Sequence, residues 1–221
     1  MNAGASGARD RVLDTAERLF AERGPDAVSV RDITNAAGVN LAAINYHFGS
    51  KQALIAAVFE RRMRPLTEAR LRALDGVEAV AGDQPPKLEA VLDALFRPAV
   101  EQALDPARGG GTFAKLMARC LIEPNAVVEQ TIRSDFETVV KRFDAALMRA
   151  MPGLTADDVF WRRHWLIGAL HHSLLMLGRK PPGGRRLPLD IESYAERFVA
   201  FAAAGFRAVL PGESRKRSQA K

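Results

Sequence analysis

The sequence contains a single cysteine among its 221 residues, and this scarcity excludes two kinds of site. One thiol cannot form an internal disulfide, and Cys120 has no second thiolate with which to build a cysteine-based metal centre. Structural disulfides belong to oxidising compartments, so a reducing cytoplasm is the expected location.

Long apolar segments are also absent. The amino terminus, MNAGASGARDR, lacks the apolar stretch of a signal peptide, so none is expected. The most apolar runs, LIGAL before His171 and SLLMLG after it, together fall short of the roughly 20 residues that a membrane-spanning helix needs. With 48% hydrophobic and 26% charged residues, the chain is predicted to be soluble and folded, without a membrane partner.

Signatures of catalysis are missing as well. No histidine follows a glutamate by three positions, as a di-iron carboxylate site requires, and no nucleophile elbow occurs. The run Gly109–Gly111 lacks the Gly-Lys-Ser/Thr ending of a phosphate-binding loop and is read as a flexible linker. His164 and His171 lie one heptad apart, about 10 Å along a helix, which is too far for one metal ion without a second chain. We therefore expect no enzyme activity, no cofactor and no metal.

Acidic residues are absent between Ile33 and Phe59, in a chain that has 26 of them. A surface that faces phosphates would avoid such residues, because carboxylates repel nucleic acid. The net charge of +6 and the isoelectric point near 9.9 also favour an anionic partner. The alternative is that this acid-free stretch arises by chance.

Almost every segment has the periodicity of a helix. Apolar residues recur at helical spacing from Arg9 to Arg23, and Gly24 with Pro25 then ends that helix. Ser29 and Asp32 form a capping box that begins a second, short helix.

A third helix is predicted after a tight turn at Gly38. Asn40 can cap it, Ile44 and Phe48 would point inward, and Gly49 with Ser50 ends it and begins a fourth helix. Two short helices joined by a glycine-containing turn have the outline of a helix-turn-helix.

The third helix would turn a neutral face outward. Its residues there are Leu41, Ala42, Asn45 and Tyr46, a surface that solubility does not require. Lys51, in the first turn of the next helix, opposes the helix dipole, and such a local cost suggests a function such as gripping a phosphate. The alternative is that Tyr46 and its neighbour are ordinary helix-end residues with satisfied polar groups.

The segment from about Arg11 to Phe59 resembles the amino-terminal DNA-binding domain of TetR-type transcriptional regulators. The matching residues are AERLFAERGPDAVSVRDITNAAGVN followed by LAAINYHFGSKQALIAAVF. The resemblance implies a homodimer that binds a palindromic operator in double-stranded DNA and releases it when a small molecule occupies the carboxy-terminal domain. It also implies the DNA-binding residues, with Asn40 as the cap, Leu41, Ala42 and Ala43 nearest the bases, and Ser29, Arg31, Tyr46, His47 and Lys51 on the backbone.

Two positions depart from the family pattern. Asn45 stands where members commonly have tyrosine, and Leu41 often corresponds to a polar or basic residue. An asparagine can pair with adenine through two hydrogen bonds, and a leucine can contact the thymine methyl group. The departures therefore affect base preference rather than docking.

The fold class is predicted to be all-α, with a helix-turn-helix domain at 8–60, a helical effector-binding and dimerisation domain at 61–211 and a basic, disordered tail at 212–221. Pro65 should kink or end the fourth helix and is a candidate hinge. The stretch from Asp75 to Pro86, with two glycines and two prolines, reads as a loop.

Kinked helices with aromatic and aliphatic stripes in the carboxy-terminal part can enclose an apolar effector cavity. The residues expected to line it are Phe96, Phe113, Met117, Leu121, Phe136, Val140 and Trp165. The alternative for each of them is ordinary core.

The last two helices are expected to run from a capping box at Thr155 and Asp158 to Gly178, and from about Asp190 to Leu210. By the resemblance, this pair forms a four-helix bundle with its copy in a homodimer. The residues assigned to that interface are Trp161, Leu170, Leu174, Phe198, Ala202 and Gly205. The alternative is intramolecular core.

The segments EQALDPARGGGTFAKLMARCLIEPN and WRRHWLIGAL are similar to the TetR subgroup that responds to fatty acids or other acyl ligands. The function predicted is a ligand-responsive repressor, released by a small apolar or acyl effector. Two alternatives remain, a helical small-molecule-binding protein whose helix-turn-helix is only structural, and a general nucleoid-type DNA binder.

Overall fold

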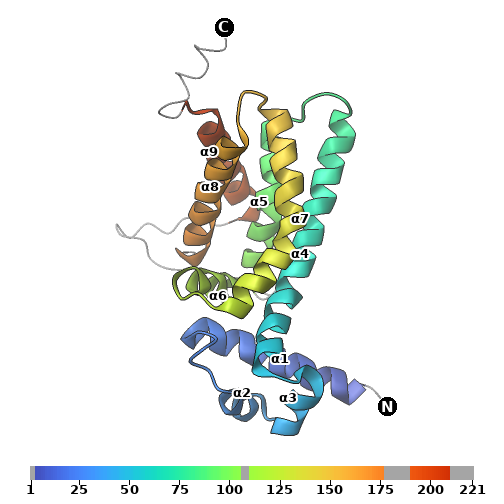
Figure 1. The fold of residues 1–221 in the computed structure, drawn as a ribbon, viewed down its shortest axis with the longest axis vertical. Helices are drawn as coiled ribbons and strands as arrows, with labels where there is room; N and C mark the ends of the chain where they lie inside the picture. The colour runs from blue at the N-terminus through green and yellow to red at the C-terminus, as the bar shows by residue number, and fades with distance from the viewer. Residues whose placement is uncertain (1–2, 106–109, 177–189, 210–221) are drawn as a thin grey trace.

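The computed structural model describes residues 3–105, 110–176 and 190–209. Across these ranges it is built from nine α-helices and contains no strand (Figure 1), as expected for an all-α chain. The helices are α1 (Ala3–Arg23), α2 (Val30–Ala37), α3 (Leu41–Phe48), α4 (Lys51–Ala81), α5 (Leu88–Leu104), α6 (Gly110–Ile122), α7 (Ala126–Ala150), α8 (Ala156–Met176) and α9 (Ile191–Arg207). None of the described helices combines the length and the apolar character needed to cross a membrane.

The short helices begin and end where the capping residues predict. Ser29 and Asp32 form the reciprocal capping box of α2, and Gly38 ends that helix with a φ of 65°, a left-handed conformation that glycine adopts without a steric penalty. Asn40 accepts a hydrogen bond from the backbone N–H of Ala43, and Ser50 does the same for Ala53. Local hydrogen bonds therefore set the helix-turn-helix geometry.

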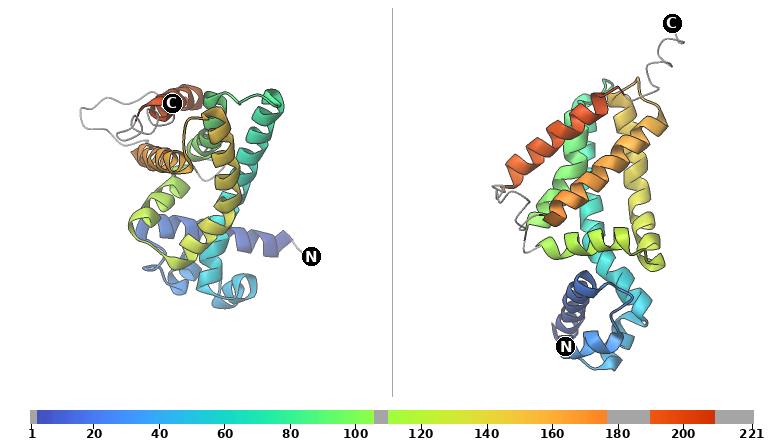
Figure 2. Two further views of the ribbon diagram at one scale, coloured as in Figure 1. Left: turned by 45° about the horizontal axis from the view of Figure 1, so that its top comes forward. Right: turned by 90° about the vertical axis from the view of Figure 1, so that its left-hand side faces the viewer.

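Two hydrophobic core clusters hold the helices together. The first joins α1–α3 and the start of α4 to α6 and the start of α7. The second fills the bundle formed by the rest of α4 with α5, α7, α8 and α9. Figures 1 and 2 show α1–α3 gathered at one end of the molecule and α9 toward the other. Because α6 belongs to the first cluster, the carboxy-terminal domain contributes directly to the packing of the helix-turn-helix domain.

The fourth helix does not end at Pro65, and the predicted loop at Asp75–Pro86 is largely wrong. Helix α4 continues to Ala81, so only the residues after it are loop. The reason is tertiary packing: Arg142 of α7 pairs with Asp75 at 2.8 Å and with Glu78 at 2.6 Å, and α4 lies along α7. Such packing outweighs the weak helix propensity of a single glycine and an exposed proline.

The prediction of a flexible linker at Gly109–Gly111 is also partly wrong. Gly110 and Gly111 form the first turn of α6, where the Gly110 N–H donates to the carbonyl of Asp105 at 2.9 Å. The helix ends predicted at Gly178 and Leu210, the residue Gly109 and the tail at 212–221 lie outside the described residues.

Candidate nucleic-acid interface and internal cavity

The outward face of α3 is neutral and open to solvent. Leu41 is 51% exposed and Tyr46 is 84% exposed, and Ala42 and Asn45 are exposed beside them. Ile44, on the opposite face, is 1% exposed and packs in the first core cluster. Helical spacing therefore predicted the orientation of α3 correctly. This face lies at the end of the molecule where α2 and α3 are found (Figure 1).

Three rings follow one another at the end of α3. The ring centroids of Tyr46 and His47 are 5.0 Å apart, and those of His47 and Phe48 are 6.1 Å apart, both in edge-to-face geometry. The guanidinium of Arg9, from α1, lies 5.5 Å from the centroid of the Phe48 ring. The sequence pattern carries no signal for Arg9, because only tertiary packing brings α1 beside α3. The result is a cation beside the half-buried Phe48 ring at the end of α3.

Lys51 is the first residue of α4, and its ammonium is already anchored. Its Nζ donates to the backbone carbonyl of Asp26, in the turn between α1 and α2, at 3.2 Å. An ammonium has three N–H donors, so this hydrogen bond leaves two for other acceptors. The backbone N–H groups at the start of the same helix add a positive dipole end there.

Ser29 is held within its own capping box. Its hydroxyl donates to the Asp32 carboxylate at 2.8 Å and accepts from the Asp32 backbone N–H at 3.1 Å. The hydrogen bonds from Ser29, together with Arg23 nearby, hold the pKa of Asp32 below its usual value. The hydroxyl proton is therefore engaged by Asp32, whereas the side chain of the neighbouring Arg31 is exposed.

The side chain of Asn40 is used to cap α3, and the side chain of Ala43 is partly covered. The side-chain oxygen of Asn40 accepts from the Ala43 N–H at 2.9 Å, and Ala43 is half-buried. Ala43 thus has less surface to offer than Ala42, one residue earlier.

An apolar cavity of about 220 Å³ lies among α4, α5, α6, α7 and α8. The predicted residues that line it are Phe96, Phe113, Met117, Leu121 and Phe136. Val140 and Trp165, which were assigned to the same cavity, are not among the residues that line this one. Val140 lies one turn farther along α7, and Trp165 is 52% exposed on the outer side of α8.

Three polar side chains interrupt the apolar lining, and sequence reasoning missed all of them. They are Arg70 of α4, Gln102 of α5 and His171 of α8. His171 donates from Nδ1 to the carbonyl of Ile167, and burial lowers the pKa of its ring, with Arg70 adding to the effect. Arg70 could have been noticed, because it occupies the position between Leu66 and Leu74 in an apolar stripe of period four.

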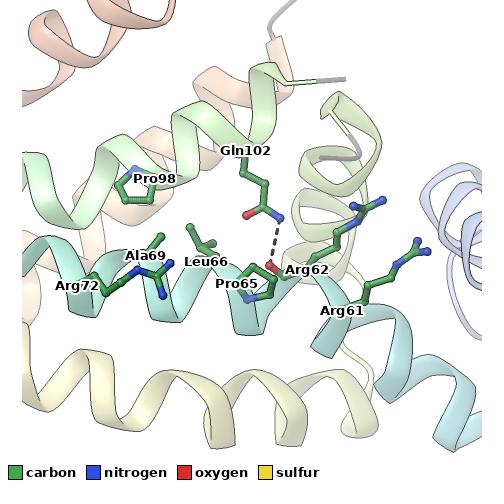
Figure 3. Close-up of a pocket in the computed structure, with 8 residues that line it drawn as sticks. All are labelled: Arg61, Arg62, Pro65, Leu66, Ala69, Arg72, Pro98 and Gln102. Carbon is green, nitrogen blue, oxygen red and sulfur yellow. Dashed lines mark hydrogen bonds between the residues drawn. The ribbon is translucent and has the colours of Figure 1, made fainter. Parts of the chain in front are cut away.

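A groove of about 340 Å³ runs along the outside of α4 and α5 (Figure 3). Gln102 donates from Nε2 to the carbonyl of Arg62 at 3.2 Å, one turn from the Pro65 ring. Leu66 and Gln102 line both this groove and the cavity, so they form part of the wall between them. The hydrogen bond connects the cavity wall to α4 beside the helix-turn-helix domain.

The outer surface of α8 and α9 carries exposed aromatic side chains. Trp161 is 49% exposed, Trp165 is 52% and Phe201 is 63%, and Gly205 is also exposed. Between the two helices lies a small, mainly apolar groove of about 290 Å³, lined by Trp165, Phe201 and Gly205 among others. Helices α8 and α9 lie side by side in Figure 2.

Four residues assigned to a dimer interface are instead buried within one chain. Leu170, Leu174, Phe198 and Ala202 are at most 9% exposed, so they offer little surface to a second chain. The inward face of α9 packs on α5, where the rings of Phe198 and Phe96 are 5.1 Å apart. Of the assigned set, Trp161 and Gly205 remain at the surface.

No cluster of three or more histidine, cysteine or acidic side chains suited to a metal ion occurs among the described residues. Cys120 is half-buried, and desolvation raises the pKa of its thiol to about 11. A thiol held in its protonated form is a poor nucleophile and a poor metal ligand.

Two family models match this chain. One, described as "Bacterial regulatory proteins, tetR family", covers residues 12–58, and the other, "Tetracyclin repressor-like, C-terminal domain", covers residues 93–205. The first spans the helix-turn-helix and its flanking helices, and the second spans most of the helical bundle.

Curated relatives match over a short segment. The HTH-type transcriptional repressor KstR2 of Rhodococcus jostii is 48% identical over 52 residues, 24% of this chain and 26% of the relative. The HTH-type transcriptional regulator AcrR of Shigella flexneri is 40% identical over 52 residues, 24% of each chain. The chain thus spans about a quarter of the length of these relatives.

Solved structures share the whole fold. The regulator FadR from Bacillus subtilis, in complex with stearoyl-CoA, superposes with a TM-score of 0.65 at 16% identity, covering 89% of this chain and 98% of that one. A TetR-family regulator from Bordetella parapertussis gives a TM-score of 0.63 at 17% identity, covering 92% and 98%. Since the carboxy-terminal family model alone covers half of the sequence, the chain belongs to the TetR family of bacterial regulatory proteins.

Proposed function

We propose that this protein is a ligand-responsive transcriptional repressor that binds a pseudo-palindromic operator as a homodimer. The observation that carries the proposal is the exposed face of α3, where Leu41, Ala42, Asn45 and Tyr46 stand clear of the core with no acidic residue between Ile33 and Phe59. A neutral helix of this kind fits the major groove, with Asn45 and Leu41 against base edges.

The DNA backbone is gripped on both sides of α3 in this proposal. Tyr46 and His47 contact phosphates from the end of α3, Lys51 contacts them from the start of α4, and Arg31 contacts them from α2. Arg9, held over the Phe48 ring, joins this set because it adds a cation beside the rings.

The homodimer forms through the outer surface of α8 and α9. The exposed rings of Trp161, Trp165 and Phe201 surround an apolar groove, and such aromatic patches are typical of protein interfaces. Two protomers joined in this way place two copies of α3 in successive major grooves, about 34–36 Å apart or at a related spacing.

The effector is a small apolar or acyl molecule that fills the cavity between α4 and α8. The stearoyl-CoA complex of the FadR protein from Bacillus subtilis supports the choice of acyl compounds as test ligands. Helix α6 transmits the binding of the effector to the DNA-binding helices. Its residue Phe113 lines the cavity and also packs on Phe59, with the ring centroids 5.9 Å apart. On its other side, Arg119 of α6 donates to the carbonyl of Glu22 in α1 at 3.0 Å.

The proposal is tested by exposing the purified protein to fragmented genomic DNA and sequencing what it retains. The expected result is a set of fragments that share a pseudo-palindrome, with binding that weakens steeply as salt rises. Ala42→Glu places a charge on the outer face of α3 and should reduce retention at least about tenfold, since like charges at an interface are strongly unfavourable. Ala145→Glu, at an exposed position of α7, is the matched control.

Other outcomes favour the alternatives. Retention of no fragment at low salt would favour a helical ligand-binding protein whose helix-turn-helix is structural. Retention of all fragments alike would favour a nucleoid-type binder.

A further inference from the structure

Arg70 is a charged side chain in the wall of an otherwise mainly apolar cavity. It is 6% exposed, its Nε donates to the carbonyl of Leu95 at 2.8 Å, and its guanidinium carbon lies 5.0 Å from the centroid of the Phe136 ring. These contacts hold the guanidinium plane in position. A carbonyl and an aromatic face do not neutralise its charge.

The remaining donor capacity of Arg70 is unused in the described part of the chain. Its Nη1 is buried and has no hydrogen-bond partner, and among the described residues no carboxylate forms an ion pair with Arg70. Asp135 of α7, beside Phe136, also has a buried oxygen without a partner, but it does not pair with Arg70. No aspartate or glutamate lines the cavity. An uncompensated buried charge of this kind is strongly unfavourable unless a counter-ion joins it.

The guanidinium also keeps its charge near neutral pH. Burial lowers its pKa to about 10, which still leaves it protonated at pH 7. An uncharged apolar ligand would bury this cation further without pairing it. A ligand with an anionic group would satisfy Nη1 and supply the missing counter-charge, and the planar fork of an arginine suits a carboxylate or a phosphate.

We propose that the effector is an amphiphile with an apolar body and one anionic head group, and that Arg70 binds this head group inside the cavity. The aromatic and aliphatic walls, such as Phe96, Phe113 and Phe136, hold the body. The proposal rests on the proposed function only in taking this cavity as the effector site.

The test compares three ten-carbon probes by isothermal titration calorimetry, without DNA. Decanoate and decyl phosphate carry the two anionic head groups, and decanol has the same chain without a charge. The wild-type protein should bind at least one of the anions about tenfold or more tightly than decanol. The anion that binds more tightly identifies the preferred head group as a carboxylate or a phosphate.

The variant Arg70→Met should lose that preference while its affinity for decanol stays within about twofold. The matched control is Arg72→Met on the same helix, where the side chain is 69% exposed and pairs only weakly with Glu68, so the preference should persist. Equal affinity for anion and alcohol in the wild type would overturn the proposal. So would a preference that survives in Arg70→Met, or the absence of binding by all three probes.

A measurement on the wild-type protein covers the case in which Arg70→Met does not fold. The Nε–H resonance of Arg70 in the NMR spectrum, assigned by its loss in Arg70→Lys, should shift with the anionic probe and stay in place with decanol. Equal shifts with both would count against the proposal. If the protein retains no DNA but binds the anionic probe more tightly than decanol, the proposed function is wrong and the Arg70 site is supported. If it retains DNA but binds the anionic probe and decanol equally, the proposed function is supported and the Arg70 site is wrong.

Discussion

Arg62 of α4 and Glu17 of α1 form an ion pair between these two helices, with Nε 2.9 Å from Oε2. The Glu17 carboxylate is 3% exposed and also receives Arg61, whose guanidinium reaches out to Asp14. One carboxylate therefore ties the first helix to the segment of α4 that lies between the helix-turn-helix and the cavity.

Replacing Glu17 by alanine should reduce the free energy of unfolding by about 1–3 kcal/mol, because two arginines lose a buried partner while keeping some access to water. Urea unfolding measures this loss. The comparison is Glu22→Ala, which breaks only an exposed pair with Arg18 and should cost less than about 0.5 kcal/mol. Equal losses in the two variants would show that burial of Glu17 has no energetic consequence.

Lys51→Ala should weaken binding to every DNA sequence alike and lower the slope of log K against log salt by about one, since one phosphate contact is lost. Tyr46→Phe should also weaken all sequences alike, without changing that slope. Titration of operator and random duplexes at several salt concentrations measures both. Lys115→Ala, on the exposed side of α6, is the control for the loss of one positive charge. An unchanged slope for Lys51→Ala would show that Lys51 does not contact a phosphate.

Asn45→Ala should cost about 1–3 kcal/mol of binding at one base position, because Asn45 is exposed one turn after Leu41 and can pair with adenine. The measurement is the affinity of wild type and variant for operators changed at each position in turn. A uniform loss on all of them would make Asn45 a phosphate contact instead.

Phe201→Glu should dissociate the proposed dimer, because Phe201 is 63% exposed on the aromatic surface of α8 and α9. Loss of a buried aromatic anchor from an interface typically costs about 2 kcal/mol or more. Sedimentation at several concentrations measures the dissociation constant. Val80→Glu, a substitution of an even more exposed residue at the far end of α4, should leave the mass unchanged, and a stable dimer of Phe201→Glu would place the interface elsewhere.

The half-buried ring of His171 should make stability depend on pH. Burial lowers its pKa in the folded protein below the ordinary value of 6.5, so the unfolded chain binds a proton that the folded chain does not. The stability that the neutral His171 ring contributes to the folded protein is complete above the ordinary pKa of histidine, and it is lost as the pH falls through that value. The wild type should therefore lose stability from about pH 7.5 to about pH 5, and His171→Gln should lose less. Urea unfolding at both pH values checks this, with the exposed His172→Gln expected to behave as the wild type.

Much of the fold follows from local rules. The capping residues Ser29, Asn40 and Ser50 each receive the backbone hydrogen bond that their type and position predict, and Gly38 adopts the left-handed conformation of a tight turn. These features depend on a few neighbouring residues, so the local sequence is enough to reveal them. The exposed face of α3 follows in the same way from the position of Ile44.

Packing between distant segments decided the rest. Helix α4 passes Pro65 and runs on to Ala81 because α7 supports it, and no local pattern contains that information. Trp165 and Phe198 are both aromatic and have the helical spacing of core residues, yet one faces solvent and the other α5. An amphipathic pattern says which residues share a face, but not which neighbour covers that face.

The amino-acid order is therefore sufficient for the all-α class, the helix-turn-helix and its neutral outer surface, since these arise from interactions within a few turns of chain. The sequence also predicted an apolar cavity and five of the residues that line it, but the arginine in its wall and the exposed aromatic surface of α8 and α9 came only from the folded molecule. Each of them depends on how helices far apart in the chain meet, and burial, which turns Arg70 from a solvated surface charge into a buried one, is a property of that assembly.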